Sequence, residues 1–227
     1  MNRHHLAILS LTSLPLAAHA IDSTSRSFLY PNQGAYAKAG AEYSRWSGDG
    51  SSSNLYGGFV AAGLNFCESD LGYHQVEFEL GGLGGSYTET ATVGSTTGTA
   101  KIDTFALPVL GSYNYAFKIT DKAHAYLGAS AGIVYVRQTS DQLTVSGMGT
   151  LNGDLKADGV APAAGINLGI YFEISKHLGL DVGYKYLRVF SYDRDISFRS
   201  GGTAVNTSDK PGDINSHNLQ ISLSYRF

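Results

Sequence analysis

Residues 219–227 alternate strictly between large apolar and polar side chains. A period of two places the two sets on opposite faces of a β-strand. The apolar set includes Tyr225 and Phe227, so the strand stops on an aromatic residue. The fold must therefore contain a sheet that is apolar on one side and polar on the other.

Seven earlier segments repeat this alternation, and no segment between them has the period of an amphipathic helix. Eight strands is an even number, as a closed antiparallel membrane barrel requires. The sequence therefore predicts an all-β fold, an eight-stranded antiparallel up-and-down barrel. Its earlier strands are expected at 34–46, 55–66, 74–87, 104–118, 124–137, 160–174 and 178–190.

The connections between these segments alternate in length. Short turns are expected around 69–70, 120–122 and 175–177, and longer polar loops at 47–54, 88–101, 139–158 and 191–216. In transmembrane barrels, short turns lie on the periplasmic side and long loops on the outside. Both ends of the barrel are therefore predicted on the periplasmic side, and the 191–216 loop is a candidate contact surface for an external ligand.

Which parity faces outward separates a membrane barrel from a soluble, lipocalin-like ligand-binding barrel. Charged residues are 15% of the chain, against about 25% in typical soluble domains. The polar parity is mostly small, as in Gly165, Asn167 and Gly169, and small residues suit the lumen of an eight-stranded barrel. The large parity, here Ile166 and Leu168, then faces lipid, and closure of the barrel leaves no strand edge unpaired.

Eight charged side chains fall on the inner parity. Buried charges must be paired, because an unpaired one is costly. They predict either a plugged lumen held shut by salt bridges or a narrow gated porin for small solutes, in which the pairs exchange partners. This predicted lumen network consists of Lys38, Glu42, Glu77, Glu79, Glu173, Asp181, Lys185 and Arg226.

Aromatic residues gather near the strand ends, as in the girdles of membrane barrels. One predicted girdle, at the turn end, contains Tyr115, Phe117, Phe172, Tyr225 and Phe227. A second, at the loop end, contains Tyr43, Trp46, Tyr56, Tyr135 and Tyr186.

The first twenty residues have the pattern of a secretory signal peptide. Arg3 precedes an apolar run, and Ala18 and Ala20 supply the small residues before a cleavage site. The predicted division is a signal peptide at 1–20 and a barrel at 21–227. Cys67 is the only cysteine, so no internal disulfide is expected.

Candidate reactive groups are few. His217 with Ser216 and Asp213 is the one loop-end combination that could serve catalysis, and a solvated polar cluster is the preferred interpretation. His74, His124 and His177 are expected at the turn end on strands that are not neighbours, which does not favour a metal site. No catalytic, cofactor-binding or metal-binding residues are therefore predicted. The net charge of −3 argues against nucleic acid as a partner.

Residues 107–117 and 172–186 resemble small outer-membrane β-barrel domain proteins, the porin-family, OmpA-like and OmpW-like group. The last nine residues resemble the assembly signal of such barrels, which implies that Tyr225 and Phe227 are read by the barrel assembly machinery. The resemblance implies a monomer in the lipid of the bacterial outer membrane, without a periplasmic domain. It implies a structural or surface-interaction role rather than an enzyme activity.

Overall fold

The computed structural model describes residues 34–48, 51–93, 96–145, 149–200 and 203–227, all of which belong to one compact unit. The predicted signal peptide, 1–20, lies outside the described residues. Every regular element in the described part is a β-strand. The same part contains no helix long and apolar enough to cross a membrane.

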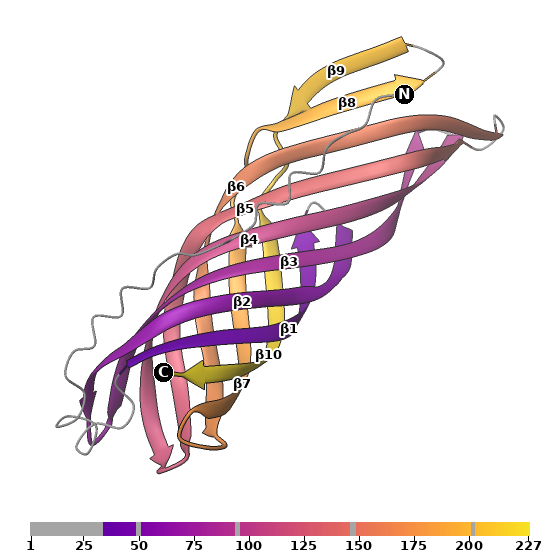
Figure 1. The fold of residues 1–227 in the computed structure, drawn as a ribbon. Helices are drawn as coiled ribbons and strands as arrows, with labels where there is room; N and C mark the ends of the chain where they lie inside the picture. The colour runs from indigo at the N-terminus through magenta and orange to yellow at the C-terminus, as the bar shows by residue number, and fades with distance from the viewer. Residues whose placement is uncertain (1–33, 49–50, 94–95, 146–148, 201–202) are drawn as a thin grey trace, which may run out of the picture. The chain divides into compact units, whose positions relative to one another are not determined.

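Eight strands form a closed antiparallel ring, which confirms the predicted fold class. Around the ring the order is β1, β2, β3, β4, β5, β6, β7 and β10, and β10 pairs back with β1. Two further strands, β8 and β9, form a hairpin attached to β6 (Figure 1). The strands are β1 (Gly34–Gly48), β2 (Ser51–Ser69), β3 (Gly72–Val93), β4 (Thr96–Thr120), β5 (Ala123–Val145), β6 (Gly149–Glu173), β7 (Leu178–Val189), β8 (Arg194–Ser200), β9 (Thr203–Asp209) and β10 (Ile214–Arg226).

The predicted long loops are wrong in extent, because much of each is strand. In the predicted loop 88–101, residues 88–93 pair with 96–101, and in the predicted loop 139–158, residues 139–145 pair with 149–156. Most of 47–54 extends β1 and β2, and 191–216 contains β8 and β9. Backbone pairing continues here without apolar alternation, since neither face of a strand outside the membrane has to meet hydrocarbon.

The three short turns lie at the opposite end of the barrel from these hairpins, as predicted. They connect β2 to β3, β4 to β5, and β6 to β7. In the last of them, Ser175 Oγ accepts hydrogen bonds from the amides of His177 and Leu178. Phe227 N donates to Ala35 O at 3.1 Å, so the last residue lies beside the start of β1. We call this the turn end, and the opposite one the loop end.

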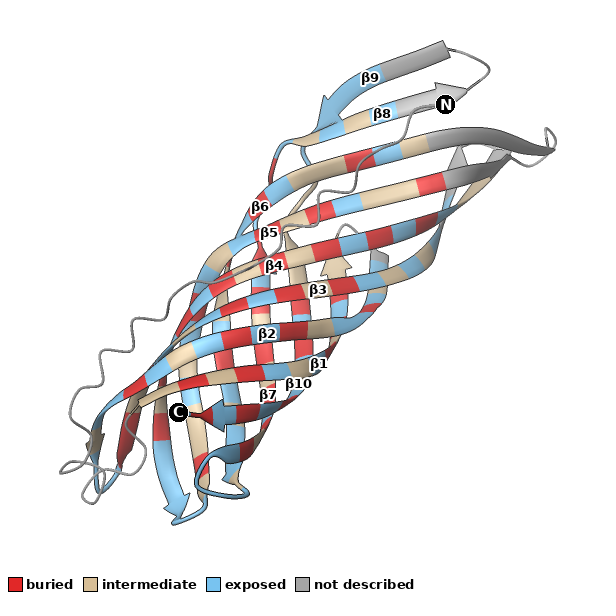
Figure 2. Ribbon diagram, in the orientation of Figure 1, coloured by how far each residue is buried: buried red, intermediate tan, exposed pale blue. Residues whose placement is uncertain are grey.

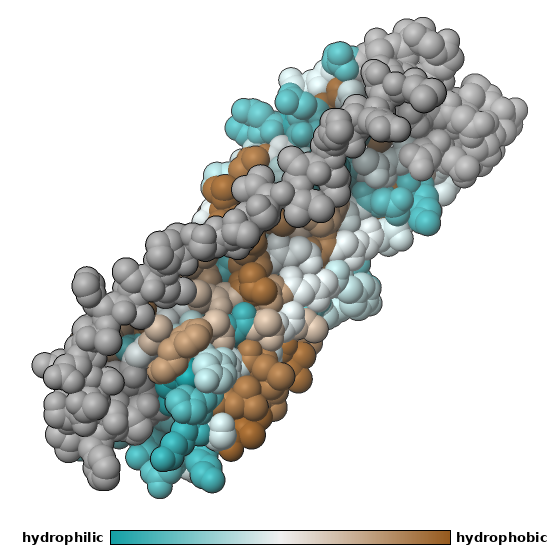
Figure 3. Space-filling model, viewed as in Figure 1, coloured by the Kyte–Doolittle hydropathy of each residue, from teal (hydrophilic) through white to brown (hydrophobic). Residues whose placement is uncertain are grey.

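The large apolar parity points outward around the ring. Val60, Phe78 and Leu127 are 55%, 58% and 54% exposed, whereas the polar residues that alternate with such positions are mostly buried. Figure 2 shows this alternation as bands along each strand. On the face drawn in Figure 3, apolar side chains lie over the middle of the barrel and hydrophilic ones near both ends. A lipocalin-like barrel would have its apolar parity inside.

Candidate functional site: the filled lumen and the loop-end cavity

The lumen near the turn end is filled by a cation held between two carboxylates. Lys38 Nζ, on β1, lies 2.7 Å from Glu77 Oε2 on β3 and 3.2 Å from Asp181 Oδ2 on β7. Tyr36 Oη donates to Glu77 Oε2 at 2.8 Å, and Tyr126 Oη donates to Asp181 Oδ1 at 3.0 Å. The structure thus brings three of the predicted charges together and adds two tyrosines.

A second ion pair lies next along the lumen. Lys185 Nζ on β7 is 2.6 Å from Glu79 Oε1 on β3, and both side chains are almost fully buried. Gln220 Nε2 donates to Glu42 Oε2 at 3.1 Å and to Glu79 Oε2 at 3.3 Å. Gln220 therefore connects the carboxylate of Glu42 to the pair.

The remaining two predicted lumen charges lie toward the turn end. Arg226 is buried, and its Nη2 donates to Tyr171 Oη at 3.3 Å. Glu173 is partly exposed near the end of β6, and no ion pair to it is found among the described residues. Six of the eight predicted lumen charges thus form two connected groups. Of the other two, Arg226 contacts an aromatic ring, and Glu173 belongs to neither group.

Sequence reasoning missed a chain of polar side chains that crosses five strands. Gln75 Nε2 donates to Asn65 Oδ1, Asn114 Nδ2 to Gln75 Oε1, Asn167 Nδ2 to Asn114 Oδ1, and Ser130 Oγ to Asn167 Oδ1, at 3.1–3.3 Å. We call this the amide ladder. Its members share the inner parity, and cross-strand register would have been needed to see that they meet.

Toward the loop end the lumen contents change from polar to apolar. A cluster of buried apolar side chains fills the lumen there. Trp46 belongs to this cluster and is 6% exposed. The predicted place of Trp46 in an outer aromatic girdle is therefore wrong. Trp46 shares the parity of Glu42 and Ser44, so the alternation itself indicated an inward side chain. The apolar plug consists of Trp46, Leu55, Leu83, Ala106, Leu110, Val134, Val136, Ala161, Ala163, Leu187, Val189 and Tyr192.

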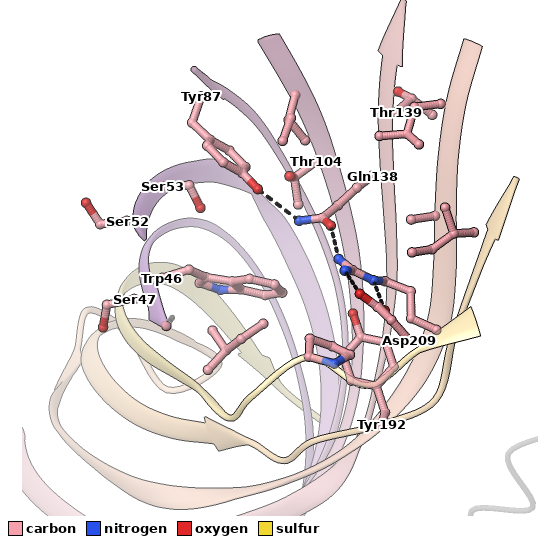
Figure 4. A pocket seen from close by; sticks show the side chains of 18 of the residues that line it. Trp46, Ser47, Ser52, Ser53, Tyr87, Thr104, Gln138, Thr139, Tyr192 and Asp209 are labelled. Atoms are coloured by element: carbon pink, nitrogen blue, oxygen red, sulfur yellow. Dashed lines mark hydrogen bonds and ion pairs between the residues drawn. The ribbon is translucent and has the colours of Figure 1, made fainter. Parts of the chain in front are cut away.

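A cavity of about 400 Å³ lies directly on the apolar plug, and we call it the loop-end cavity. Trp46 and Tyr192 belong to both, so the plug forms part of its lining. Thr104 on β4, Gln138 on β5 and Arg194 on β8 contribute polar lining (Figure 4). The strand extensions that replaced the predicted loops therefore build this cavity.

One side of the cavity is held by a continuous chain of polar contacts, drawn in Figure 4. Gln138 Nε2 donates to Tyr87 Oη at 3.3 Å, and Arg194 Nη1 donates to Gln138 Oε1 at 2.8 Å. Arg194 also makes a bidentate pair with Asp209, with Nε to Oδ1 at 2.9 Å and Nη2 to Oδ2 at 2.7 Å. These hydrogen bonds from Arg194 lower the pKa of the Asp209 carboxyl below its usual value. The pair joins β8 to β9 at the open end of their hairpin.

The candidate catalytic combination at the loop end does not come together. Ser216 Oγ is buried in the lumen, where it forms hydrogen bonds with Ser44 Oγ and Asn218 Oδ1. The His217 ring lies on the outer face, with Nδ1 2.7 Å from Tyr184 Oη. Asp213 accepts from Arg188 and from the amide of Ser191. Adjacent strand residues point to opposite faces, so Ser216 and His217 cannot act on one substrate atom.

The turn-end histidines are equally separate. His74 is paired with Tyr113 Oη on the outside, His124 is buried in the lumen against Tyr73, and His177 Nδ1 contacts Arg226 O. In the part of the chain that the structure describes, no group of three or more His, Cys, Asp or Glu side chains could hold a metal ion. Cys67 is exposed beside the first turn, with a φ of 52°.

The two residues of the predicted assembly signal lie on the outer face. Tyr225 is 50% exposed, and its ring packs edge-on against that of Phe227 at 5.4 Å between centroids. The His177 ring also stacks against the Tyr225 ring, with 5.8 Å between the ring centroids. An aromatic surface is therefore accessible from outside the barrel at the turn end.

Comparison with known proteins gives the same architecture. Neisserial surface protein A has a crystal structure with a TM-score of 0.53 and 16% identity, over 86% of this chain and 97% of that one. A major outer membrane protein from Thermus thermophilus has a TM-score of 0.57 and 12% identity, over 86% of this chain and all of that one. At such identities the likeness shows the fold alone. No curated protein sequence matches.

Family membership follows from the sequence match rather than from these structures. Residues 6–227 match the family described as the outer membrane protein beta-barrel domain, which is nearly the whole chain. This confirms the resemblance found in the sequence and places the barrel in the bacterial outer membrane, with its large apolar parity in hydrocarbon. The chain belongs to the outer membrane β-barrel domain family.

Proposed function

We propose that this protein is a closed outer-membrane anchor that holds an extracellular sheet for surface contacts. The observation that carries the proposal is the filling of the lumen at two successive levels, one ionic and one apolar. A solute would have to displace both. The proposal assigns no catalytic activity to the barrel.

The ionic level leaves little space. The cavity that remains beside Lys38, Asp181 and Arg226 measures about 20 Å³, enough for roughly one water molecule. Separating Lys38 from Glu77 and Asp181 would leave buried charges unpaired, which is strongly unfavourable. These contacts support a lumen that stays shut.

The apolar level argues against the alternative of a narrow gated porin. Charged pairs can exchange partners as an ion passes. The groups around Lys38 and Lys185 consist of such lysine–carboxylate pairs. The plug side chains cannot do this, because an apolar side chain cannot replace the water molecules that hydrate an ion. They include Leu110, Val134 and Leu187. Because the apolar plug lies in series with the ion pairs, it favours the closed anchor.

The long strands support a role in surface contact. Toward the loop end, β3 stays paired with β4 and β5 with β6, while β6 also pairs with β8, and β8 pairs with β9. A barrel that served only as a membrane plug would not need this extended sheet. In the proposal the sheet meets an external ligand, the apolar outer face meets lipid, and the assembly machinery reads Tyr225 and Phe227 while a monomer inserts.

Planar-bilayer recording of the purified protein tests the closed lumen. The proposal predicts no discrete current steps, while a known pore in the same bilayers supplies the positive control. A second arm uses Leu110→Ala with Val134→Ala, which shortens two plug side chains without touching an ion pair. Current steps from this variant but not from the parent protein would locate the barrier in the plug. Discrete steps from the parent protein would show that the lumen conducts.

Adhesion of cells tests the surface role. Removing residues 194–209 deletes β8 and β9 and leaves the ring strands intact. Cells carrying the deletion should bind host or abiotic surfaces less than cells carrying equal amounts of the complete barrel. Unchanged adhesion would argue against this hairpin as the contact surface.

A further inference from the structure

We propose that the loop-end cavity binds a small amphipathic monocarboxylate, a molecule with an apolar body and one anionic head. The cavity is a binding site and not part of a passage. Its volume of about 400 Å³ lies in the range of small-molecule sites, about 300–1,000 Å³. The inference is independent of the proposed surface contacts.

The lining contains the apolar surface that the body of such a ligand requires. Trp46 and Tyr192 come from the apolar plug, and Ile214 packs against it. Ile102 and Leu155 continue the apolar lining on β4 and β6. Binding sites for small ligands usually combine such a surface with a few polar groups that fix orientation.

Two buried hydrogen-bonding atoms in this lining have no partner among the described residues. They are Trp46 Nε1 and Thr104 Oγ1. Their residues are 6% and 4% exposed, and they reach the same cavity from β1 and β4 (Figure 4). An indole nitrogen can only donate, and a threonine hydroxyl can donate. A buried donor without an acceptor is unfavourable, so an oxygen of a ligand within reach of either group would relieve that cost.

The charge of the lining selects an anion. Arg194 and Lys210 carry two positive charges, and Asp209 carries one negative charge. The hydrogen bonds of Arg194 to Asp209 and Gln138 keep its guanidinium in place as part of the wall. Lys210 is exposed at the cavity. Two donors and a net positive charge favour a carboxylate over an amine.

The apolar plug determines what happens to a bound molecule. It fills the lumen between the cavity and the ion pairs, so a carboxylate entering from the loop end meets a closed floor. Crossing the plug would also require dehydration of the anion. The ligand is therefore held and released on the same side.

Trp46 is the only tryptophan, so its fluorescence reports directly on the cavity. The test uses protein purified from membranes and reconstituted in lipid nanodiscs, with hexanoate as the probe. We expect a saturable change in Trp46 emission with hexanoate. Hexylamine, which has the same chain with a cationic head, and acetate, which lacks the apolar body, should give no saturable change.

Substitutions at the polar groups sharpen the test. Thr104→Val keeps the side-chain shape and removes the hydroxyl, and should weaken hexanoate binding about tenfold, as expected for one hydrogen bond to a charged group. Lys210→Gln should weaken it roughly two- to fivefold. Thr88→Val is the matched control on an exposed position, and should bind like the parent protein. Heat-modifiable gel migration shows that each variant is folded.

Partition of the probe into lipid is measured with Trp46→Phe/Leu168→Trp, which moves the one indole to the outer face. The emission of this variant should change linearly with hexanoate concentration, as lipid partition would give, or should not change. A response of the parent protein that is equally linear would overturn the proposal. The proposal would also be overturned if hexanoate bound saturably and with equal affinity to Thr104→Val and Thr88→Val. The ligand would then lie outside the loop-end cavity.

Discussion

Lys185 Nζ and Glu79 Oε1 lie 2.6 Å apart across the lumen, with side chains 5% and 2% exposed. The pair joins β7 to β3, two strands that are not neighbours in the ring. It therefore holds opposite walls of the barrel together, which backbone ladders between adjacent strands cannot do.

Removing one member of this pair should be strongly destabilising. Lys185→Met leaves the Glu79 carboxylate buried without its cation, and we expect a loss of about 3–5 kcal/mol in the free energy of unfolding. Urea titration of the barrel in lipid vesicles measures this loss. The double variant Lys185→Met/Glu79→Gln should recover part of it.

The exposed pair between Lys118 and Asp121 at the turn end is the control. It has a comparable distance, 2.8 Å, but both side chains meet solvent. Asp121→Asn should cause no measurable loss, because exposed ion pairs contribute little. Equal losses at the buried and exposed pairs would contradict the burial argument.

The outer face should reject a charge. Leu168 points outward from β6 and pairs with Leu127 and Tyr184 on the neighbouring strands. Leu168→Arg should cost about 2–4 kcal/mol if the position lies near the bilayer midplane. Leu71→Arg, in an exposed turn, should cost much less. Folding titrations with a negligible difference between the two variants would contradict the assigned facing.

Gly128 should be needed for the amide ladder. In the register, Asn114 and Asn167 flank Gly128 on either side, and their amides meet across it. A Cβ at Gly128 would collide with Asn114 Oδ1 and with the backbone carbonyl oxygen of Tyr113, so Gly128→Ala should cost about 1–3 kcal/mol. Gly82→Ala is the control, since its Cβ would have no atom within 4 Å. Vesicle unfolding that gives the same value for both would refute the steric argument.

The hairpin of β8 and β9 should loosen in acid. The pKa of Asp209 in the folded protein is lowered by its hydrogen bonds from Arg194, so the contribution of the pair is present above the unfolded pKa. It is lost as the pH falls through the folded value, and that window lies below about pH 4. Trp46 emission should therefore stay constant at neutral pH and change once the pH falls below about 4.

Asp209→Asn removes the charge at every pH. Its Trp46 emission at neutral pH should resemble that of the parent protein in acid, since both indole and pair line one cavity. Asp193→Asn, at an exposed neighbouring position, should keep the parent profile. If Asp209→Asn still showed the full acid transition in Trp46 emission, the transition would belong to another titrating group and the prediction would be wrong.

The alternation of side chains was sufficient to predict the ring. Strands such as β6 and β10 carry Leu, Ile and Phe on one parity because hydrocarbon lies on one side of them, so the pattern survives in the sequence. The extensions at 88–101 and 139–158 were mistaken for loops because neither face of a strand outside the membrane has to meet hydrocarbon. Threonine, serine and glycine then suffice, and no periodic signal remains.

The contents of the lumen were only partly predictable. Charges on the inner parity indicated where Lys38 and Lys185 lie, but not which carboxylates they meet, because that depends on strands distant in sequence. Leu110 and Leu187 were hidden for a different reason. They lie on the inner parity among apolar neighbours, so they read as ordinary strand residues. The loop-end cavity depends on β8, a strand the sequence did not reveal.

Quenching by lipids with brominated acyl chains tests the facing of the barrel most directly. The parent protein carries its indole inside the ring at Trp46, and Trp46→Phe/Leu168→Trp carries it on the outer face. In the same bilayers we predict strong quenching of the outer indole and little quenching of Trp46. Strong quenching of Trp46 together with an unquenched indole at position 168 would contradict the account.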